Sequence, residues 1–220
     1  MTDPALSRIR RGVSLSQVVA DRLRRAILSG AFPEGAPLPE AQTAARLGVS
    51  RVPVREALVE LERRGLVEFD AHGRSRVKSF TEEDVAEILG LRAALQAMAA
   101  GLAASRLTPQ DVGRLESLLA RAARTHDLTK FSALDSAFHD EIVAIARHRR
   151  LSRAWTDLRS QMDLWLARLH RRRESARHDV RPVTLASHRE IVEVLKTRRP
   201  EAAARRLRKH CGGLALEGFL

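Results

Sequence analysis

Four side chains of types that commonly bind metal ions stand at helical spacing in the C-terminal half of this 220-residue chain. Asp135 and His139 are four residues apart beside an apolar stripe, so they share one face of a predicted helix. His188 precedes the apolar residues of its own helix by one turn, and His210 lies one turn after Leu207. The pattern therefore places one carboxylate and three imidazoles, from three helices, in the interior of a helical bundle.

The chemistry that these four groups favour is the binding of a divalent metal ion. Their burial costs several kcal/mol unless each finds a partner, and one ion would satisfy all of them. Nitrogen and oxygen ligands suit zinc, nickel, manganese or iron; ligand type alone does not choose, and zinc is the ion we expect first. A five- or six-coordinate ion would keep one or two positions for water or a small anion. A single inward histidine is more often a hydrogen-bonded core residue, so a metal-free domain is the alternative.

A second group of side chains, near the N-terminus, fits contact with DNA. Arg51 and Arg55 are four residues apart at the start of a predicted helix, on the face opposite its apolar residues. Arginine there can donate two hydrogen bonds to O6 and N7 of guanine, and the helix N-terminus favours a nearby phosphate. An isolated surface arginine is usually just solvated, but both arginines here stand at the end of the helix that such a motif directs at DNA.

Three predicted helices position these arginines. Apolar spacing predicts a helix over 15–29, and a proline-rich loop leads to a short helix over 40–46 that Gly48 ends. Ser50 is a good N-cap for the helix that follows, over 51–64. Two helices linked in this way indicate a helix-turn-helix, whose second helix enters the major groove.

A small β-hairpin follows the helices in the prediction. Two β-prone runs, 66–69 and 76–80, flank a turn that carries His72 and Arg74. Their donors suit the minor groove or the DNA backbone. We therefore expect residues 1–80 to form a winged helix-turn-helix.

The remainder of the chain, 81–220, is predicted to be a separate, all-helical domain of about six helices. Amphipathic runs follow one another without a strand-like segment, and Thr81 is a good N-cap for the first. Short polar breaks separate the runs at 108–109, 126–129, 171–182 and 199–200. The fold class expected for the whole chain is therefore mainly α.

The amino-acid composition limits the classes of function that the protein can have. Lys plus Arg number 39 against 27 acidic residues, a net charge of +12 that points to a polyanionic partner. A single cysteine, Cys211, cannot form an internal disulfide, which favours a reducing cytoplasm. We expect no membrane span, since no apolar run approaches about 20 residues, and no signal peptide. The protein is therefore expected to be cytoplasmic.

The N-terminal motif resembles a known family. The run GVSRVPVREAL from Gly48 to Leu58, with Gly65 and Gly73 after it, is similar to the operator-binding domain of GntR-type bacterial transcription regulators over about 15–80. Val52 stands where that family usually has threonine; valine can contact a thymine methyl group but cannot donate a hydrogen bond. The DNA-binding residues expected in this chain are Ser50, Arg51, Val52, Arg55, His72, Gly73 and Arg74.

The C-terminal part resembles the metal-binding version of the FCD domain, the ligand-sensing domain of the FadR subfamily, over about 82–215. The resemblance implies that the metal-ligand positions are those of Asp135, His139, His188 and His210. It also implies that Arg92 faces the cavity, where it would hold an effector carboxylate by a bidentate pair. Gln96 stands where the family pattern has glutamate, so an internal charge partner for Arg92 is expected to be missing.

Together these features predict a metabolite-responsive transcription regulator, a repressor that binds a palindromic operator on double-stranded DNA as a homodimer. A small carboxylate at the metal site would be the effector. The alternative is a metal-dependent hydrolase fused to a DNA-binding module. It is disfavoured because the sequence has no His-Glu-x-x-His motif and because Glu141 and Glu190 lie on other helical faces than their neighbouring histidines.

Overall fold

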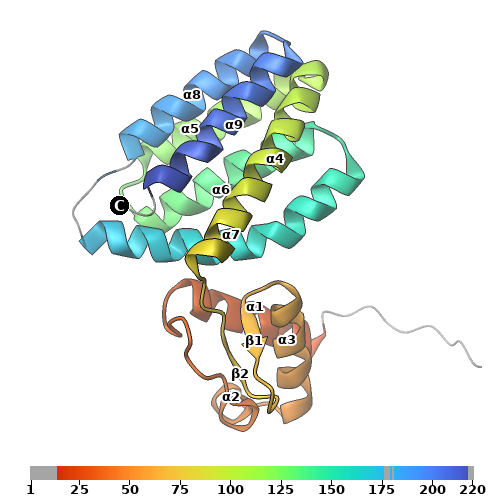
Figure 1. The fold of residues 1–220 in the computed structure, drawn as a ribbon, viewed down its shortest axis with the longest axis vertical. Coiled ribbons are helices and arrows are strands. Elements are labelled where there is room, and N and C mark those ends of the chain that lie inside the picture. The colour runs from red at the N-terminus through yellow and green to blue at the C-terminus, as the bar shows by residue number, and fades with distance from the viewer. Residues whose placement is uncertain (1–13, 176–178, 180, 218–220) are drawn as a thin grey trace, which may run out of the picture. The chain divides into compact units, whose positions relative to one another are not determined.

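The computed structural model describes residues 14–175, 179 and 181–217. The chain forms two compact units and passes from one to the other between Lys78 and Ser79; the expected division was after residue 80. Among the described residues the first unit consists of three helices and a hairpin, and the second of helices alone; Figure 1 shows their arrangement within each unit. The predicted fold class, mainly α with a winged N-terminal unit and a C-terminal helical bundle, is confirmed.

The first unit contains α1 (Leu15–Leu28), α2 (Glu40–Leu47) and α3 (Arg51–Arg63). Ser14 and Gln17 form a capping box that begins α1. Gly48 ends α2 in the left-handed conformation, with φ of 68°, which glycine adopts without strain. α1 packs against α3. The side chains that fill this core are fully or almost fully buried: Ile27, Leu38, Val54, Leu58 and Leu61.

The hairpin consists of β1 (Val67–Phe69) and β2 (Ser75–Val77), paired antiparallel with Val67 opposite Val77. The loop before α2 packs against it, because the backbone N–H of Leu38 donates to the carbonyl of Ser75 and the Ser75 hydroxyl donates to the carbonyl of Leu38. The strands are shorter than the runs that the sequence predicted.

The second unit begins with a capping box of Thr81 and Asp84. Within the described residues it holds six helices: α4 (Glu82–Arg106), α5 (Pro109–Arg124), α6 (Leu128–Ile145), α7 (Arg149–Ser175), α8 (Arg181–Lys196) and α9 (Pro200–Glu217). The break predicted over 171–182 begins later than expected, since α7 continues to Ser175. Its arginine-rich end contains neither glycine nor proline, and arginine is a good helix former.

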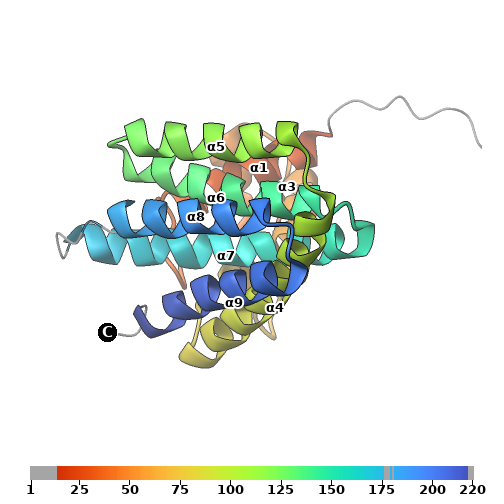
Figure 2. The same cartoon turned by 90° about the horizontal axis from the view of Figure 1, so that it is seen from above.

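The bundle places α6, α8 and α9 around a common interior. α4 packs most extensively against α9 and also contacts α6 and α7. The two helices α4 and α9 lie side by side in both views (Figures 1 and 2), and α5 lies on the opposite side of the bundle from α4 (Figure 2). Helix α8 contacts both α5 and α9. Side chains that point inward from α6, α8 and α9 can therefore meet.

A polar network connects helix ends at one end of the bundle. Asp111 is buried, accepts from the backbone N–H of Thr108 at 2.9 Å, and forms ion pairs with Arg114 and Arg147. Arg147, which has a φ of 44°, donates in turn to the carbonyl of Arg106 at 3.1 Å. The network therefore ties the start of α5 to the end of α4 and to the turn between α6 and α7.

We expected no apolar run long enough to span a membrane, and one helix departs from that expectation. Helix α4 is long and apolar enough to cross a membrane by length and composition, since Arg92 is the single charged residue from Ile88 to Ser105. Half of its most apolar window is buried in the bundle, and the core helix of a soluble protein passes the same test. Arg92 and Gln96 are both buried against other helices, which fits such a core helix.

Candidate metal centre and nucleic-acid interface

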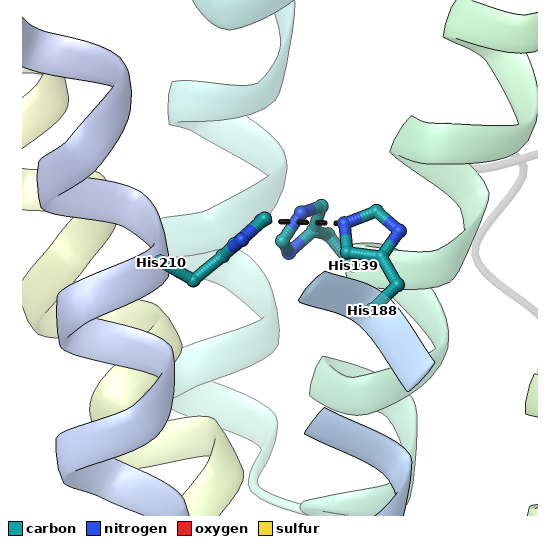
Figure 3. A group of neighbouring side chains, drawn as sticks. All are labelled: His139, His188 and His210. Carbon is teal, nitrogen blue, oxygen red and sulfur yellow. Dashed lines mark hydrogen bonds between the residues drawn. The ribbon is translucent and has the colours of Figure 1, made fainter. Parts of the chain in front are cut away.

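Three helices bring the three predicted histidines together. His139 comes from α6, His188 from α8 and His210 from α9, and their rings converge (Figure 3). One nitrogen from each ring can be chosen so that all three lie within 4.8 Å of one another. Nε2 of His188 is 3.2 Å from Nε2 of His210. This cluster of His139, His188 and His210 is called the histidine cluster below.

Asp135 stands next to the histidine cluster, one turn before His139. Its Oδ1 is 3.4 Å from Nε2 of His188, and its side chain is 13% exposed. Two ligands of one zinc ion, each about 2.1 Å away, are separated by roughly 3.0 to 3.4 Å at octahedral or tetrahedral angles. Both distances from Nε2 of His188, to Asp135 and to His210, fit this requirement.

The environment keeps the three imidazoles neutral. Burial, followed by the charge of Arg92, holds the pKa of His139 well below its ordinary value. Burial is also the main cause that lowers the pKa of His188 and of His210 to about 3. Neutral imidazole is the form that binds metal ions, so the cluster is in the required protonation state at neutral pH.

Arg92 and Gln96, both on α4, contact the cluster through His139. Nη2 of Arg92 lies 3.0 Å from Nε2 of His139, and Oε1 of Gln96 lies 3.3 Å from its Nδ1. A proton on Nδ1 would be donated to Gln96 and would leave the Nε2 lone pair directed at Arg92. Arg92 is 1% exposed, and its Nε and Nη1 have no hydrogen-bond partner among the described residues. The position predicted for the effector arginine is thus adjacent to the predicted metal ligands.

The residues present fit a divalent ion. Three neutral imidazoles and a carboxylate form a donor set suited to zinc and to other first-row metals, and they come from three separate helices. Nη2 of Arg92 lies 3.0 Å from Nε2 of His139, so an ion bound at that nitrogen would require the guanidinium to turn to another acceptor.

Two further residues at the cluster were missed in the sequence. Oγ of Ser187 lies 2.8 Å from Nδ1 of His210, and Nη2 of Arg206 lies 2.7 Å from Oγ of Ser187. The one available signal was the spacing of Arg206, four residues before His210 and therefore on the same face of α9. Nothing in the local pattern marks Ser187.

The predicted DNA-reading side chains lie at the N-terminus of α3. Ser50 takes the N-cap position with extended backbone, but its hydroxyl makes no capping hydrogen bond to the described chain. Val52 is 66% exposed, which is unusual for valine and suits contact with a base. The side chains of Arg51 and Arg55 are exposed, and each lies near the carboxylate of Glu40, at 3.6 and 3.8 Å.

The hairpin turn presents His72, Gly73 and Arg74 to solvent. Gly73 has a φ of 73°, where a residue with a Cβ is strained. Asp70 accepts hydrogen bonds from the backbone N–H groups of His72 and Arg74 and from the Arg74 side chain. The bonds from Arg74, foremost the one from its backbone, lower the pKa of Asp70 to about 2. Arg74 is therefore held by a local ion pair at 2.8 Å.

A comparison with protein families assigns each of the two units to a known family. Residues 15–77 match the family of bacterial regulatory proteins called gntR, and residues 87–213 match the FCD domain. FCD domains are often associated with a metal.

Individual relatives of the chain agree with this family assignment. The chain is 34% identical over 212 residues to a "Probable D-xylose utilization operon transcriptional repressor" of Paenarthrobacter nicotinovorans, covering 94% of this chain and 90% of the relative. It is 28% identical over 183 residues to the gluconate operon transcriptional repressor of Bacillus subtilis, covering 82% and 75%. The solved structure of E. coli McbR/YncC has the same fold, with a TM-score of 0.76 at 24% identity over 95% of this chain and 100% of that one.

These relatives are transcription regulators rather than enzymes, so the prediction of a regulator is confirmed and the disfavoured alternative, a fused hydrolase, is wrong. The chain belongs to the GntR family of DNA-binding transcriptional regulators and carries an FCD domain.

Proposed function

We propose that this regulator is a repressor that binds a palindromic operator as a homodimer and responds to a small carboxylate at a metal site. The ligands would be Asp135, His139, His188 and His210, with zinc as the first candidate and nickel, manganese or iron as alternatives. The word repressor in the names of relatives supports the direction of regulation. DNA would be bound by the predicted residues of α3 and of the hairpin turn.

The observation that carries the effector proposal is the state of Arg92. Its guanidinium is buried, no carboxylate of the described residues pairs with it, and two of its nitrogens have no partner. A buried charge without a partner is costly, whereas a bound carboxylate would accept two parallel hydrogen bonds from a guanidinium. The metal ion would supply a second point of attachment for the same anion. A small carboxylate therefore fits both groups.

The homodimer proposal is supported by the outward face of α4. Leu91 and Met98 are 50% and 48% exposed, and from Ile88 to Ser105 the single charged residue, Arg92, is buried. An exposed helix face without charge fits a copy of itself across a two-fold axis. A palindromic operator requires the same symmetry. Replacement of Leu91 by glutamate should shift the protein to monomer in analytical ultracentrifugation, and an unchanged mass would count against this face.

The experiment that tests the effector proposal begins with an operator selected from a random duplex library by the full-length protein. Its affinity is then measured with a panel of small carboxylates that includes gluconate, with and without Zn(II). We expect one carboxylate to lower the affinity only when zinc is present, and Arg92→Met to abolish the response. Arg153→Met, which removes an exposed arginine of α7, is the control that retains it. A response that survives in Arg92→Met would refute the proposed site.

A further inference from the structure

A chain of hydrogen bonds reaches the second ring nitrogen of His210. Oγ of Ser187, on α8, is 2.8 Å from Nδ1 of His210. Nη2 of Arg206, on α9, donates to Oγ of Ser187 at 2.7 Å and to its carbonyl oxygen at 3.1 Å. The same nitrogen is 2.9 Å from Oε2 of Glu190. Building on the metal site proposed above, we propose that Ser187, held in place by Arg206, is the positioning residue that orients His210 for metal binding.

The chemistry of imidazole gives this contact its consequence. A histidine that binds a metal through Nε2 must carry its proton on Nδ1, and the partner of Nδ1 fixes both the tautomer and the plane of the ring. A serine hydroxyl has two lone pairs, so Ser187 can accept from Nδ1 of His210 while it accepts from Arg206. The lone pair of Nε2 is then directed toward His188, whose Nε2 is 3.2 Å away.

The positions of the residues in the fold strengthen the inference. Ser187 directly precedes His188 on α8, and Arg206 lies one turn before His210 on α9. Each helix therefore contributes one metal ligand and one member of the hydrogen-bond chain. Arg206, with a side chain 17% exposed, bonds both the hydroxyl and the carbonyl of Ser187. These hydrogen bonds thus join α8 to α9 beside His188 and His210, whose separation must suit the binding of one ion.

The test is the affinity of the full-length protein for Zn(II), measured by competition with a chromophoric chelator. Partners of this kind are worth 10- to 100-fold in metal affinity, so Ser187→Ala should raise the Kd for zinc by about that factor. Ser187→Thr retains a hydroxyl and should restore most of the affinity. Thr184→Ala, which removes a hydroxyl one turn earlier on the same helix, is the matched control and should bind zinc like the wild type.

A readout by thermal unfolding separates positioning from a structural role. A 10- to 100-fold loss of affinity removes about 1.4 to 2.7 kcal/mol from the stabilisation by saturating zinc. The rise in Tm that zinc causes should therefore be smaller in Ser187→Ala than in the wild type. An equal fall in Tm with and without zinc would show a structural role only and overturn the inference.

The visible spectrum of the Co(II)-loaded protein gives a further readout, since it reports the geometry of the ligands directly. It should change in Ser187→Ala and return in Ser187→Thr. If wild-type protein binds zinc and Ser187→Ala binds it equally well, this inference alone is wrong. If the wild type binds no zinc, the metal site of the proposed function fails, and the role of Ser187 fails with it.

Discussion

Acidification of the metal-free protein should destabilise the helical domain through the histidine cluster. The pKa values of His188 and His210 fall from 6.5 in the unfolded chain to about 3 in the folded one, chiefly because of burial. Between these values the unfolded chain binds more protons than the folded chain. The free energy of unfolding is therefore fully retained above pH 6.5 and decreases as the pH falls from there toward 3. His139, with its pKa shifted in the same direction, adds to the effect.

The loss of unfolding free energy can be calculated from the pH range over which the unfolded chain binds the extra protons. One pH unit is worth about 1.4 kcal/mol for each group that titrates in only one of the two states. From pH 7 to pH 5, His188 and His210 together should remove about 4 kcal/mol from the free energy of unfolding. A loss of this size is a large fraction of the roughly 5 to 15 kcal/mol that holds a domain folded.

Urea denaturation after treatment with a chelator, at pH 7 and at pH 5, measures this loss. Both tryptophans, Trp155 and Trp165, lie on α7, so their fluorescence reports the helical domain. The double variant His188→Gln/His210→Gln should show a pH dependence smaller by about 4 kcal/mol. His72→Gln, in the hairpin turn, should behave like the wild type. An unchanged pH dependence in the double variant would refute the reasoning.

Three further predictions concern other parts of the chain. Arg55→Ala should cost about 1 to 3 kcal/mol of operator affinity and relax the preference at one base pair, measured by titration of a selected operator and its single-base variants. Asp111→Asn should lower the free energy of unfolding by about 2 kcal/mol, because the lost bonds involve a charged acceptor. Burial alone would raise the pKa of Asp111, but bonds from Thr108 and nearby arginines lower it, so denaturation below pH 3.8 should show this difference shrinking. Gly73→Ala should cost about 1 kcal/mol of unfolding free energy, since its φ of 73° is strained for alanine although no atom lies within 4 Å; urea unfolding followed by circular dichroism tests this.

The sequence predicted the elements where local signals are strong. Gly48 adopts the left-handed conformation that ends α2, and the predicted helices over 15–29 and 51–64 are α1 and α3 within one residue at either end. Such signals depend on a few neighbouring residues. The end of α7 was placed wrongly because a polar, arginine-rich run is typical both of a loop and of an exposed helix. Hydrophobic periodicity cannot distinguish the two.

The sequence likewise predicted part of the candidate site and missed the contacts between helices. The inward histidines followed from the spacing of apolar residues on their own helices, and the structure brings His139, His188 and His210 together. The contact from Ser187 to His210 did not follow, because it depends on how α8 and α9 are rotated against each other. The ion pairs of Arg51 and Arg55 with Glu40 likewise cross from one helix to another. Local periodicity carries no information on such contacts.

The glutamine at position 96 explains why the charge of Arg92 is not neutralised by a carboxylate on the same face of α4. Gln96 lies four residues after Arg92, on the same face of α4, so a glutamate there could pair with the guanidinium and neutralise it. Glutamine is uncharged, and its Oε1 lies instead 3.3 Å from Nδ1 of His139. The side chain at this position therefore contacts a predicted metal ligand, and among the described residues no carboxylate pairs with the arginine. A bound anion would accept from Nε and Nη1 of Arg92, which have no hydrogen-bond partner among the described residues, and it would break no ion pair to a described carboxylate.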